Sequence, residues 1–132
     1  MKLSYLFTYQ AVVAILFGLS GLVVPTTLGD IYGASLDKLA QTLAQYFGAA
    51  FITIGLISWF LRNAPESSER LWVVRSLAIG ALLGLIPAVL AITNNLVNQL
   101  GWLNVALAVI STIGFGYYGF MKTSTSEAMA AR

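Results

Sequence analysis

The sequence contains no cysteine and no histidine, and it has few charges. Without thiols, disulfide exchange and thiolate-bound zinc or iron–sulfur centres are excluded, and without imidazole the usual acid–base catalyst and axial haem ligand are missing. Charged residues make up 9% of the 132 residues, whereas soluble domains carry about 25%. The net charge of +2 is too small to indicate binding to nucleic acid. We therefore expect no metal site, no resident cofactor and no nucleic-acid partner.

The charges are confined to short segments between long apolar stretches. Charge-free stretches run from Leu3 to Gly29, from Leu39 to Leu61 and from Ser76 to Met121. A helix that crosses a membrane needs about 20 apolar residues, so these stretches hold one, one and two spans. The sequence predicts an all-α integral membrane protein, a four-helix bundle with antiparallel up-and-down topology in one domain, 1–132. The expected spans are residues 3–24, 39–61, 71–92 and 100–121, followed by a polar tail, 122–132.

Turn-forming residues separate the predicted spans. Pro25 closes the first span, and the connection that follows ends near Ser35, a candidate N-cap for the second helix, with Asp37 in its first turn. Pro65 lies in the most polar segment and separates the second and third spans. The first apolar run is longer than the core of a signal peptide, and no small-residue cleavage site follows it, so we expect it to be retained.

The basic residues lie mostly on one side of the predicted bundle. Lys38 is the one basic residue expected on the opposite side. Because basic residues in short loops favour the cytoplasm, we expect both termini there and a multi-pass protein of the cell membrane, specifically a bacterial inner membrane. The six residues expected on the cytoplasmic side are Lys2, Arg62, Arg70, Arg75, Lys122 and Arg132.

Small residues recur at every fourth position in the third and fourth spans. Small residues allow transmembrane helices to approach closely, and a spacing of four keeps them on one face. Two interpretations are open: ordinary packing inside the bundle, or a seam for a second copy or another subunit. The residues expected to pack are Ser76, Gly80, Gly84 and Ala88 in the third span and Ala108, Thr112 and Gly116 in the fourth.

Polar side chains gather near the predicted outer ends of the helices. They indicate either a shallow, outward-facing pocket lined by amides, suited to a lipid, quinone or pigment, or helix ends that project into water and headgroups. The candidate ligand-binding residues are Asp37, Gln41 and Gln45 at the start of the second helix, Asn94, Asn95 and Asn98 in the last loop, and Asn104 in the fourth span.

Three arginines near the cytoplasmic side, Arg62, Arg70 and Arg75, are candidates for contact with anionic lipid headgroups. The alternative is that they only set the orientation of the chain. No ionisable residue falls near the middle of a predicted span, where transport paths and proton relays usually place one. No nucleophile–base pair is recognisable either, so we expect no enzymatic activity.

Short glycine motifs in the first half of the chain carry a family resemblance. They are Gly21-Leu22-Val23-Val24-Pro25, Ile31-Tyr32-Gly33, and Phe47-Gly48-Ala49-Ala50 with Gly55. In these motifs and in its overall plan the chain resembles the DoxX-like group of small bacterial four-helix membrane proteins. The resemblance implies the fold, and it implies no catalytic residue.

Two functional hypotheses follow from these patterns. The first is a non-enzymatic accessory or scaffold subunit of a larger membrane complex. Its partners would be the lipid bilayer and either other membrane protein subunits or a second copy of the chain. The second is a binder or carrier of a small molecule, which would use the amide-lined outer pocket. Purification in mild detergent would separate these two hypotheses, because a scaffold should co-purify with other proteins and a binder with a small molecule.

Overall fold

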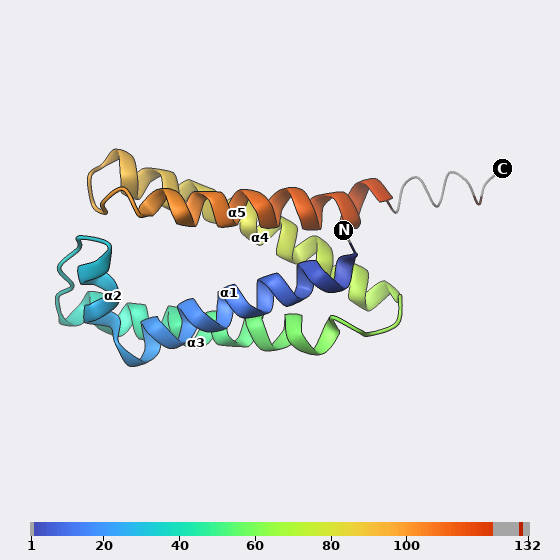
Figure 1. Cartoon of the computed structure of the whole chain (residues 1–132), viewed down its shortest axis with the longest axis horizontal. Helices are drawn as coiled ribbons and strands as arrows, with labels where there is room; N and C mark the ends of the chain where they lie inside the picture. Colours follow the sequence, from blue (N-terminus) through green and yellow to red (C-terminus); the bar gives the residue numbers. More distant parts are fainter. Residues whose placement is uncertain (1, 123–129, 131–132) are drawn as a thin grey trace.

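The computed structural model describes residues 2–122 and residue 130, and Figure 1 shows how its helices are arranged. In chain order the elements are α1 (Leu3–Val23), α2 (Pro25–Ile31), α3 (Lys38–Leu61), α4 (Ser68–Thr93), α5 (Gly101–Gly116) and the π-helical turn η1 (Tyr117–Met121). Four helical segments are long and apolar enough to cross a membrane, as in a multi-pass membrane protein: α1, α3, α4, and α5 together with η1. No strand occurs in the described ranges, which confirms the all-α prediction.

The first connection contains a helix that the sequence did not predict. Pro25 occupies the start of the short helix α2, where its missing N–H has no intrahelical partner to lose. The cap of α3 also differs from the prediction. Asp37 is the N-cap, and its carboxylate accepts a hydrogen bond of 2.8 Å from the backbone N–H of Ala40. Ser35 instead lies in the non-helical stretch 34–37, so it has no helix to cap.

Glycines bring α1 and α3 together as an antiparallel hairpin. A Cβ added to Gly48 would lie 2.6 Å from the carbonyl oxygen of Gly18, and one added to Gly55 would lie 3.1 Å from that of Ala11. Backbones this close leave no room for a side chain, which is the packing that small residues permit in membranes. The hairpin of α1 and α3 is therefore the tightly packed half of the molecule.

The helices α4 and α5 form a second antiparallel hairpin. At one end a Cβ on Gly101 would meet the side chain of Ile92, and at the other a Cβ on Gly119 would meet the side chains of Val74 and Arg75. The guanidinium Nε of Arg75 donates a 2.9 Å hydrogen bond to the carbonyl oxygen of Gly119, which links α4 to η1.

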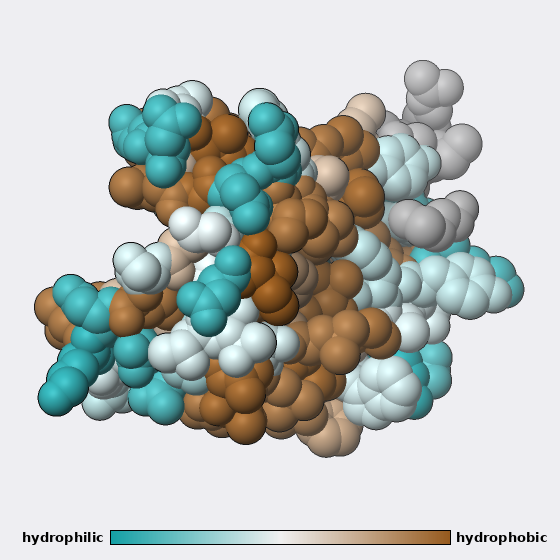
Figure 2. All heavy atoms as spheres, turned by 60° about the vertical axis from the view of Figure 1, so that its left-hand side comes forward, coloured by the Kyte–Doolittle hydropathy of each residue, from teal (hydrophilic) through white to brown (hydrophobic). Residues whose placement is uncertain are grey.

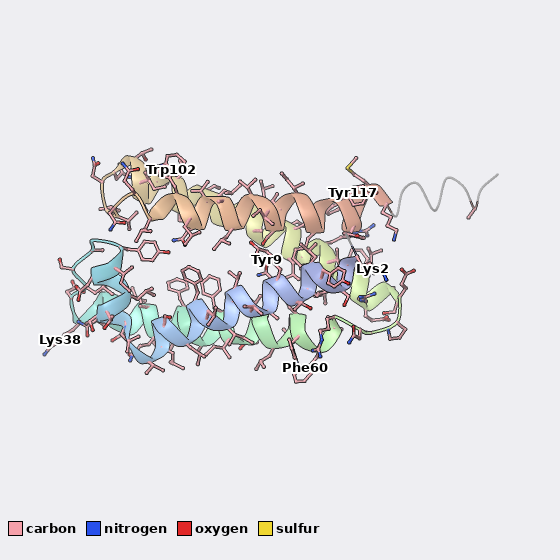
Figure 3. The ribbon with its side chains drawn as sticks, in the orientation of Figure 1. Lys2, Tyr9, Lys38, Phe60, Trp102 and Tyr117 are labelled. Atoms are coloured by element: carbon pink, nitrogen blue, oxygen red, sulfur yellow. The ribbon has the colours of Figure 1, made fainter. Side chains whose placement is uncertain are left out.

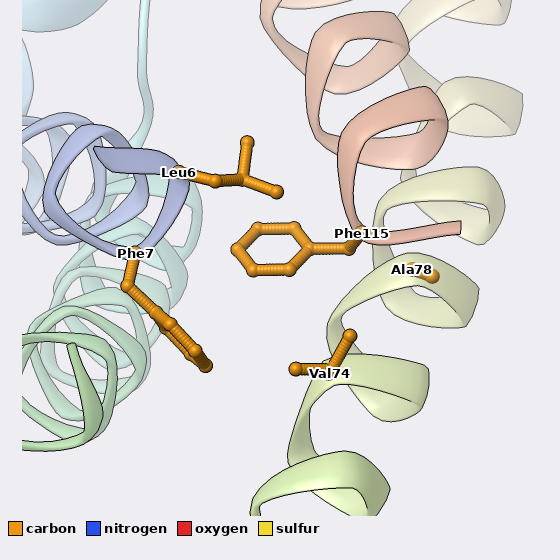
Figure 4. Packing of buried hydrophobic residues seen from close by; sticks show 5 residues of the cluster. All are labelled: Leu6, Phe7, Val74, Ala78 and Phe115. Carbon is orange, nitrogen blue, oxygen red and sulfur yellow. The ribbon is translucent and has the colours of Figure 1, made fainter. Parts of the chain in front are cut away.

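The two hairpins meet at the end of the molecule that holds Lys2, Arg62, Arg70, Arg75 and Lys122, here called the basic end. Figure 4 shows the buried cluster of Leu6, Phe7, Val74, Ala78 and Phe115 that joins α1 to α4 and α5 there. The rings of Phe7 and Phe115 pack edge to face with centroids 5.5 Å apart. This cluster is the principal apolar core.

At the opposite end the hairpins are joined by hydrogen bonds, and we call this the amide end. The backbone N–H of Asn98 donates to the carbonyl oxygen of Tyr32 at 2.8 Å, and its side-chain amide donates to that of Ile31 at 2.9 Å. The phenol of Tyr32 donates to Oδ1 of Asn104 at 2.9 Å. Tyr32, Asn98 and Asn104 together form the amide-end latch.

Between these two ends the outer surface is apolar. Figure 2 shows a brown band of hydrophobic side chains with polar residues gathered at the ends. Large side chains such as Leu83, Ile86 and Ile113 are exposed on it. A surface of this kind matches lipid tails and is typical of spanning helices.

Candidate functional site

A cavity of about 800 Å³ lies between the two hairpins. All four long helices contribute to its wall, and most of the lining is apolar, so its volume and character are those of a ligand pocket. In Figure 2 the molecule is visibly hollowed between the hairpins. We call it the interhairpin cavity. Its lining consists of Gln10, Val13 and Phe17 from α1; Phe51, Ile54 and Ile57 from α3; Val73, Ser76, Leu77, Gly80, Ala81, Gly84, Pro87 and Ala88 from α4; and Asn104, Leu107, Ala108 and Ser111 from α5.

The small-residue stripe of α4 forms one wall of this cavity. Ser76, Gly80, Gly84 and Ala88 all line it, and a Cβ added to Gly80 or Gly84 would meet no atom within 4 Å. The two glycines therefore do not pack closely against another helix of the same chain, unlike Gly48. Of the two interpretations of this stripe, ordinary packing inside the bundle therefore does not apply to Gly80 and Gly84. The missing Cβ at these positions leaves open space.

The corresponding stripe of α5 divides between two environments. Ala108 lines the cavity, and its carbonyl oxygen accepts a 2.8 Å hydrogen bond from the hydroxyl of Thr112. Gly116 lies outside the lining, and a Cβ added there would also meet nothing within 4 Å. The two predicted stripes therefore do not face each other as one continuous seam within the chain.

A small number of polar groups interrupt the apolar lining. The hydroxyl of Ser111 donates to Oε1 of Gln10 at 2.9 Å, and Oδ1 of Asn104 accepts from Tyr32. The side-chain oxygens of Gln10 and Asn104 thus each accept a hydrogen bond from a residue of the other hairpin. Within the described residues no acceptor is bound to Nε2 of Gln10 or Nδ2 of Asn104. These two amino groups can therefore donate to a molecule in the cavity.

Contacts between the hairpins lie beyond each end of the cavity. The buried cluster around Phe7 and Phe115 joins the hairpins at the basic end, and the amide-end latch joins them at the other. Burial raises the pKa of the Tyr32 phenol above its ordinary value, and the hydrogen bond with Asn104 offsets part of this rise. The phenol is therefore protonated at neutral pH and donates its hydrogen bond to Oδ1 of Asn104.

The cavity is partly open to its surroundings. Of the helices that line it, α3 and α4 have almost no close backbone contact with each other. In contrast, α1 and α5 are bridged beside it, because the hydroxyl of Tyr9 donates to the carbonyl oxygen of Leu107 at 3.0 Å.

The candidate ligand residues from the sequence are not gathered in one outward pocket. Asn104 lines the cavity and Asn98 belongs to the latch, but the others are used locally. Asp37 caps α3, and the side-chain amides of Gln41 and Gln45 donate to the carbonyl oxygens of Leu36 and Leu22. Asn94 is the C-cap of α4, and Asn95 takes a positive φ of 56° in the turn that follows.

Two polar residues of the cavity, Gln10 and Ser111, were not predicted as site residues. Each is a polar side chain inside an apolar span, and such residues usually face a helix or a cavity rather than lipid. The sequence therefore held a signal for both. Their pairing across 101 positions of the chain required the fold.

The three predicted lipid-contact arginines act separately at the basic end. Arg62 stacks on the ring of Trp59 at 3.5 Å from its centroid, and Arg75 is bound to Gly119. Arg70 donates from Nε to the carbonyl oxygen of Leu61 and from Nη2 to that of Arg62, each at 3.2 Å. Each arginine thus binds carbonyl oxygens near the end of a helix, where the negative end of the dipole favours a cation.

Neither a protein-family model nor a curated protein nor a solved structure matches the chain. The resemblance to the DoxX-like group therefore stays a prediction. Its glycines do have a structural role here, since Gly21, Gly48 and Gly55 all lie at the contact between α1 and α3. The part of the chain that the structure describes contains no cluster of three acidic side chains that could hold a metal ion.

Proposed function

We propose that the protein binds a lipid-like molecule in the interhairpin cavity, without catalysing a reaction on it. The ligand class is a long-chain lipid or prenylated quinone that carries carbonyl oxygens. The observation that carries this proposal is the cavity itself, an apolar space of about 800 Å³. We infer that a ligand enters from the bilayer between α3 and α4, because these two lining helices have almost no close backbone contact. Ligand sites of this size are usually apolar, with a few polar groups that fix the orientation.

The two carboxamides supply that orientation. Nε2 of Gln10 and Nδ2 of Asn104 donate to carbonyl oxygens of the ligand, while the oxygens of both side chains stay bound to Ser111 and Tyr32. The glycine wall of α4 gives an apolar chain or ring close access to the backbone at Gly80 and Gly84. An ester or quinone carbonyl attached to a long apolar chain satisfies both features.

The proposal is tested by mass spectrometry of lipids that remain bound to protein purified in mild detergent. Gly84→Leu places a side chain in the space that the ligand would occupy. We expect at least a fivefold loss of the retained ligand, because forcing both into one cavity costs about 1–3 kcal/mol. Gly116→Leu is the matched control, since Gly116 is equally uncrowded but lies outside the lining. Equal retention by both variants would overturn the proposal.

A second pair of variants tests the polar contacts. The double variant Gln10→Leu with Asn104→Leu should lose the ligand or exchange it for one without carbonyl oxygens. The double variant Gln41→Leu with Gln45→Leu removes the same number of amides outside the cavity and should retain it. The opposite pattern would favour the outward pocket near Gln41 and Gln45.

A second candidate function is the accessory subunit of a larger membrane complex. The uncovered stripe of Ser76, Gly80, Gly84 and Ala88 favours it, because a helix from another subunit or a second copy fits against small residues. The same purification separates the two functions. A stoichiometric protein partner that is lost in Gly84→Leu, with no specific lipid retained by the wild type, would establish the accessory role.

We propose that the basic end faces the cytoplasm and the amide end faces the opposite side, in a bacterial inner membrane. The distribution of charge supports this orientation. Lys2 and Lys38 lie at opposite ends in Figure 3, and the other described basic residues accompany Lys2. Under the positive-inside rule both chain termini are then cytoplasmic. The predicted cytoplasmic residue Arg132 lies outside the described residues.

A further inference from the structure

A second pocket, of about 680 Å³, lies at the basic end, between the beginning of α1, the beginning of α4 and the end of η1. Its lining shares no residue with that of the interhairpin cavity. Lys2, Arg70 and Lys122 line it, so three cations from distant parts of the sequence converge on one space. We call it the basic-end pocket.

The charge in this pocket is only partly compensated. Glu66 is the single carboxylate in the lining, against three cations, which leaves a formal excess of two positive charges. Among the described side chains no ion pair neutralises Lys2 or Lys122. Arg70 donates hydrogen bonds from two of its five N–H groups, to the carbonyl oxygens of Leu61 and Arg62. The pocket therefore offers unsatisfied cationic donors to an anion.

The rim and the floor of the pocket differ in polarity. The rim carries Ser67 and Ser68, whose backbone begins α4 and adds the positive end of the helix dipole. The floor is made of Leu3, Leu71 and Val74. A small inorganic anion would use only the rim, whereas a phospholipid would use the rim for its phosphate and the floor for the first carbons of its acyl chains.

We infer that the basic-end pocket binds the headgroup of an anionic phospholipid, with its phosphodiester between Lys2, Arg70 and Lys122. The pocket lies at the ends of membrane-length helices, which is the depth at which headgroups occur. The site differs from the arginine set that the sequence suggested, because Arg62 and Arg75 are bound elsewhere and only Arg70 is shared. It is independent of the function proposed for the interhairpin cavity.

The test uses the whole protein in nanodiscs of phosphatidylcholine that contain a small fraction of phosphatidylglycerol. Native mass spectrometry then measures which lipid stays bound after release. We expect the wild type to retain phosphatidylglycerol in preference to phosphatidylcholine. The double variant Lys2→Gln with Lys122→Gln should weaken this preference by about fivefold for each lysine removed. Both lysines are exposed, so the substitutions leave the core intact.

Two control variants make the result specific to the pocket. Arg62→Gln removes a charge at the same end but outside the lining, and it should retain the preference. Glu66→Gln removes the one carboxylate and should strengthen retention of phosphatidylglycerol. If Arg62→Gln weakened the preference for phosphatidylglycerol as much as the loss of one lysine does, the lipid would be attracted only by the overall positive charge of the basic end. That result would overturn the site. So would weaker retention in Glu66→Gln.

A competition experiment distinguishes a lipid from a free anion. Inorganic phosphate in large excess should not displace phosphatidylglycerol, because it makes no contact with Leu3 and Leu71 on the apolar floor. Displacement at millimolar phosphate would show that the rim alone determines binding and would overturn the assignment to a phospholipid. Absence of any lipid preference in the wild type would do the same.

Discussion

Individual glycines serve opposite purposes in the two hairpins. At Gly48 the missing side chain allows contact between backbones, with the carbonyl oxygen of Gly18 and the N–H of Leu22 both 2.6 Å from the position of a Cβ. At Gly84 the missing side chain leaves space that no atom of the chain fills. The same residue type therefore stabilises one helix pair and widens a cavity beside another helix.

This contrast predicts opposite effects of the smallest possible side chain. Gly48→Ala should destabilise the protein by about 1–3 kcal/mol, because the added methyl group displaces backbone rather than a flexible side chain. Gly84→Ala should be neutral or stabilising by up to about 1 kcal/mol, since alanine is the better helix former. Thermal unfolding in detergent, followed by circular dichroism, compares the two. Equal destabilisation would contradict the open position of Gly84.

One of the three hydrogen bonds of the amide-end latch is donated by the phenol of Tyr32. Tyr32→Phe should lower the free energy of unfolding by about 0.5–1.5 kcal/mol, since it removes the hydrogen bond to Asn104. Because burial raises the pKa of the Tyr32 phenol, the folded state holds this proton more tightly than the unfolded state. The stability from this group is present below the ordinary phenol pKa of about 10 and is lost as the pH rises through the raised value.

The measurement is the unfolding midpoint of wild type and Tyr32→Phe over the alkaline range. The difference between the two proteins should shrink as the pH approaches and passes the raised pKa of Tyr32. Tyr46→Phe is the matched control, because Tyr46 is exposed on α3. A difference that stays constant to high pH would show that the phenol does not titrate with unfolding.

Some single-residue roles followed from the sequence, whereas others depended on the fold. The polar character of Asn104 within a span singled it out in the sequence, and the structure places it in the lining of the interhairpin cavity. Ser35 was expected to cap α3, but serine and aspartate cap equally well, so the choice of Asp37 depended on where the preceding turn ends. No local rule fixes that position.

Among the helices and turns, the arginines act as links between helix ends. Arg75 in α4 binds the carbonyl oxygen of Gly119 in η1, and its guanidinium lies near the rings of Trp72 and Phe120. Arg62 binds the carbonyl oxygen of Trp59 in the last turn of its own helix. The first contact holds two elements together, while the second is local.

Substitution should reveal this difference. Arg75→Gln should destabilise the protein by about 1.5–3 kcal/mol, because a part-buried hydrogen bond from a charged group between α4 and η1 is lost. Arg62→Gln should cost less than about 1 kcal/mol, because its contacts are exposed. Titration with a denaturing detergent ranks the two variants. The reverse ranking would mean that Gly119 contributes little to the second hairpin.

The long helices were predictable because length and hydropathy define a membrane span independently of its neighbours. The short helix α2 was not, because its seven residues give too little pattern, and turn-forming residues follow it. The stripe on α4 was recognised from its spacing. Spacing shows which residues share a face, but it does not show whether that face meets a helix or a cavity.

For the molecule as a whole, the arrangement of charge predicts its orientation in the membrane. The chain has no native cysteine, so single cysteines can be introduced at Asn63, in the loop before α4, and at Asn95, in the loop after it. An impermeant thiol reagent should label Asn95→Cys in intact cells and Asn63→Cys only after the membrane is opened. Labelling of both from the same side would contradict four spans.

The cavity between the hairpins could not be derived from the sequence. It exists because α1 packs closely on α3 through Gly18 and Gly48, whereas α3 and α4 remain apart. Which helices pair is decided by contacts between residues far apart in the chain, such as Gln10 with Ser111. Hydropathy identifies each helix but carries no information about its partners, so the predicted outward pocket was placed at the helix ends instead.

The entry proposed for the ligand, between α3 and α4, has a consequence for how its binding is measured. A molecule that enters there comes from the bilayer and not from water, so its chemical potential in the membrane determines occupancy. The relevant concentration is a mole fraction of the lipid phase, and dilution of the sample with buffer leaves it unchanged. Adding empty lipid lowers it. A bound molecule should therefore be released by an excess of protein-free vesicles and survive extensive washing with buffer.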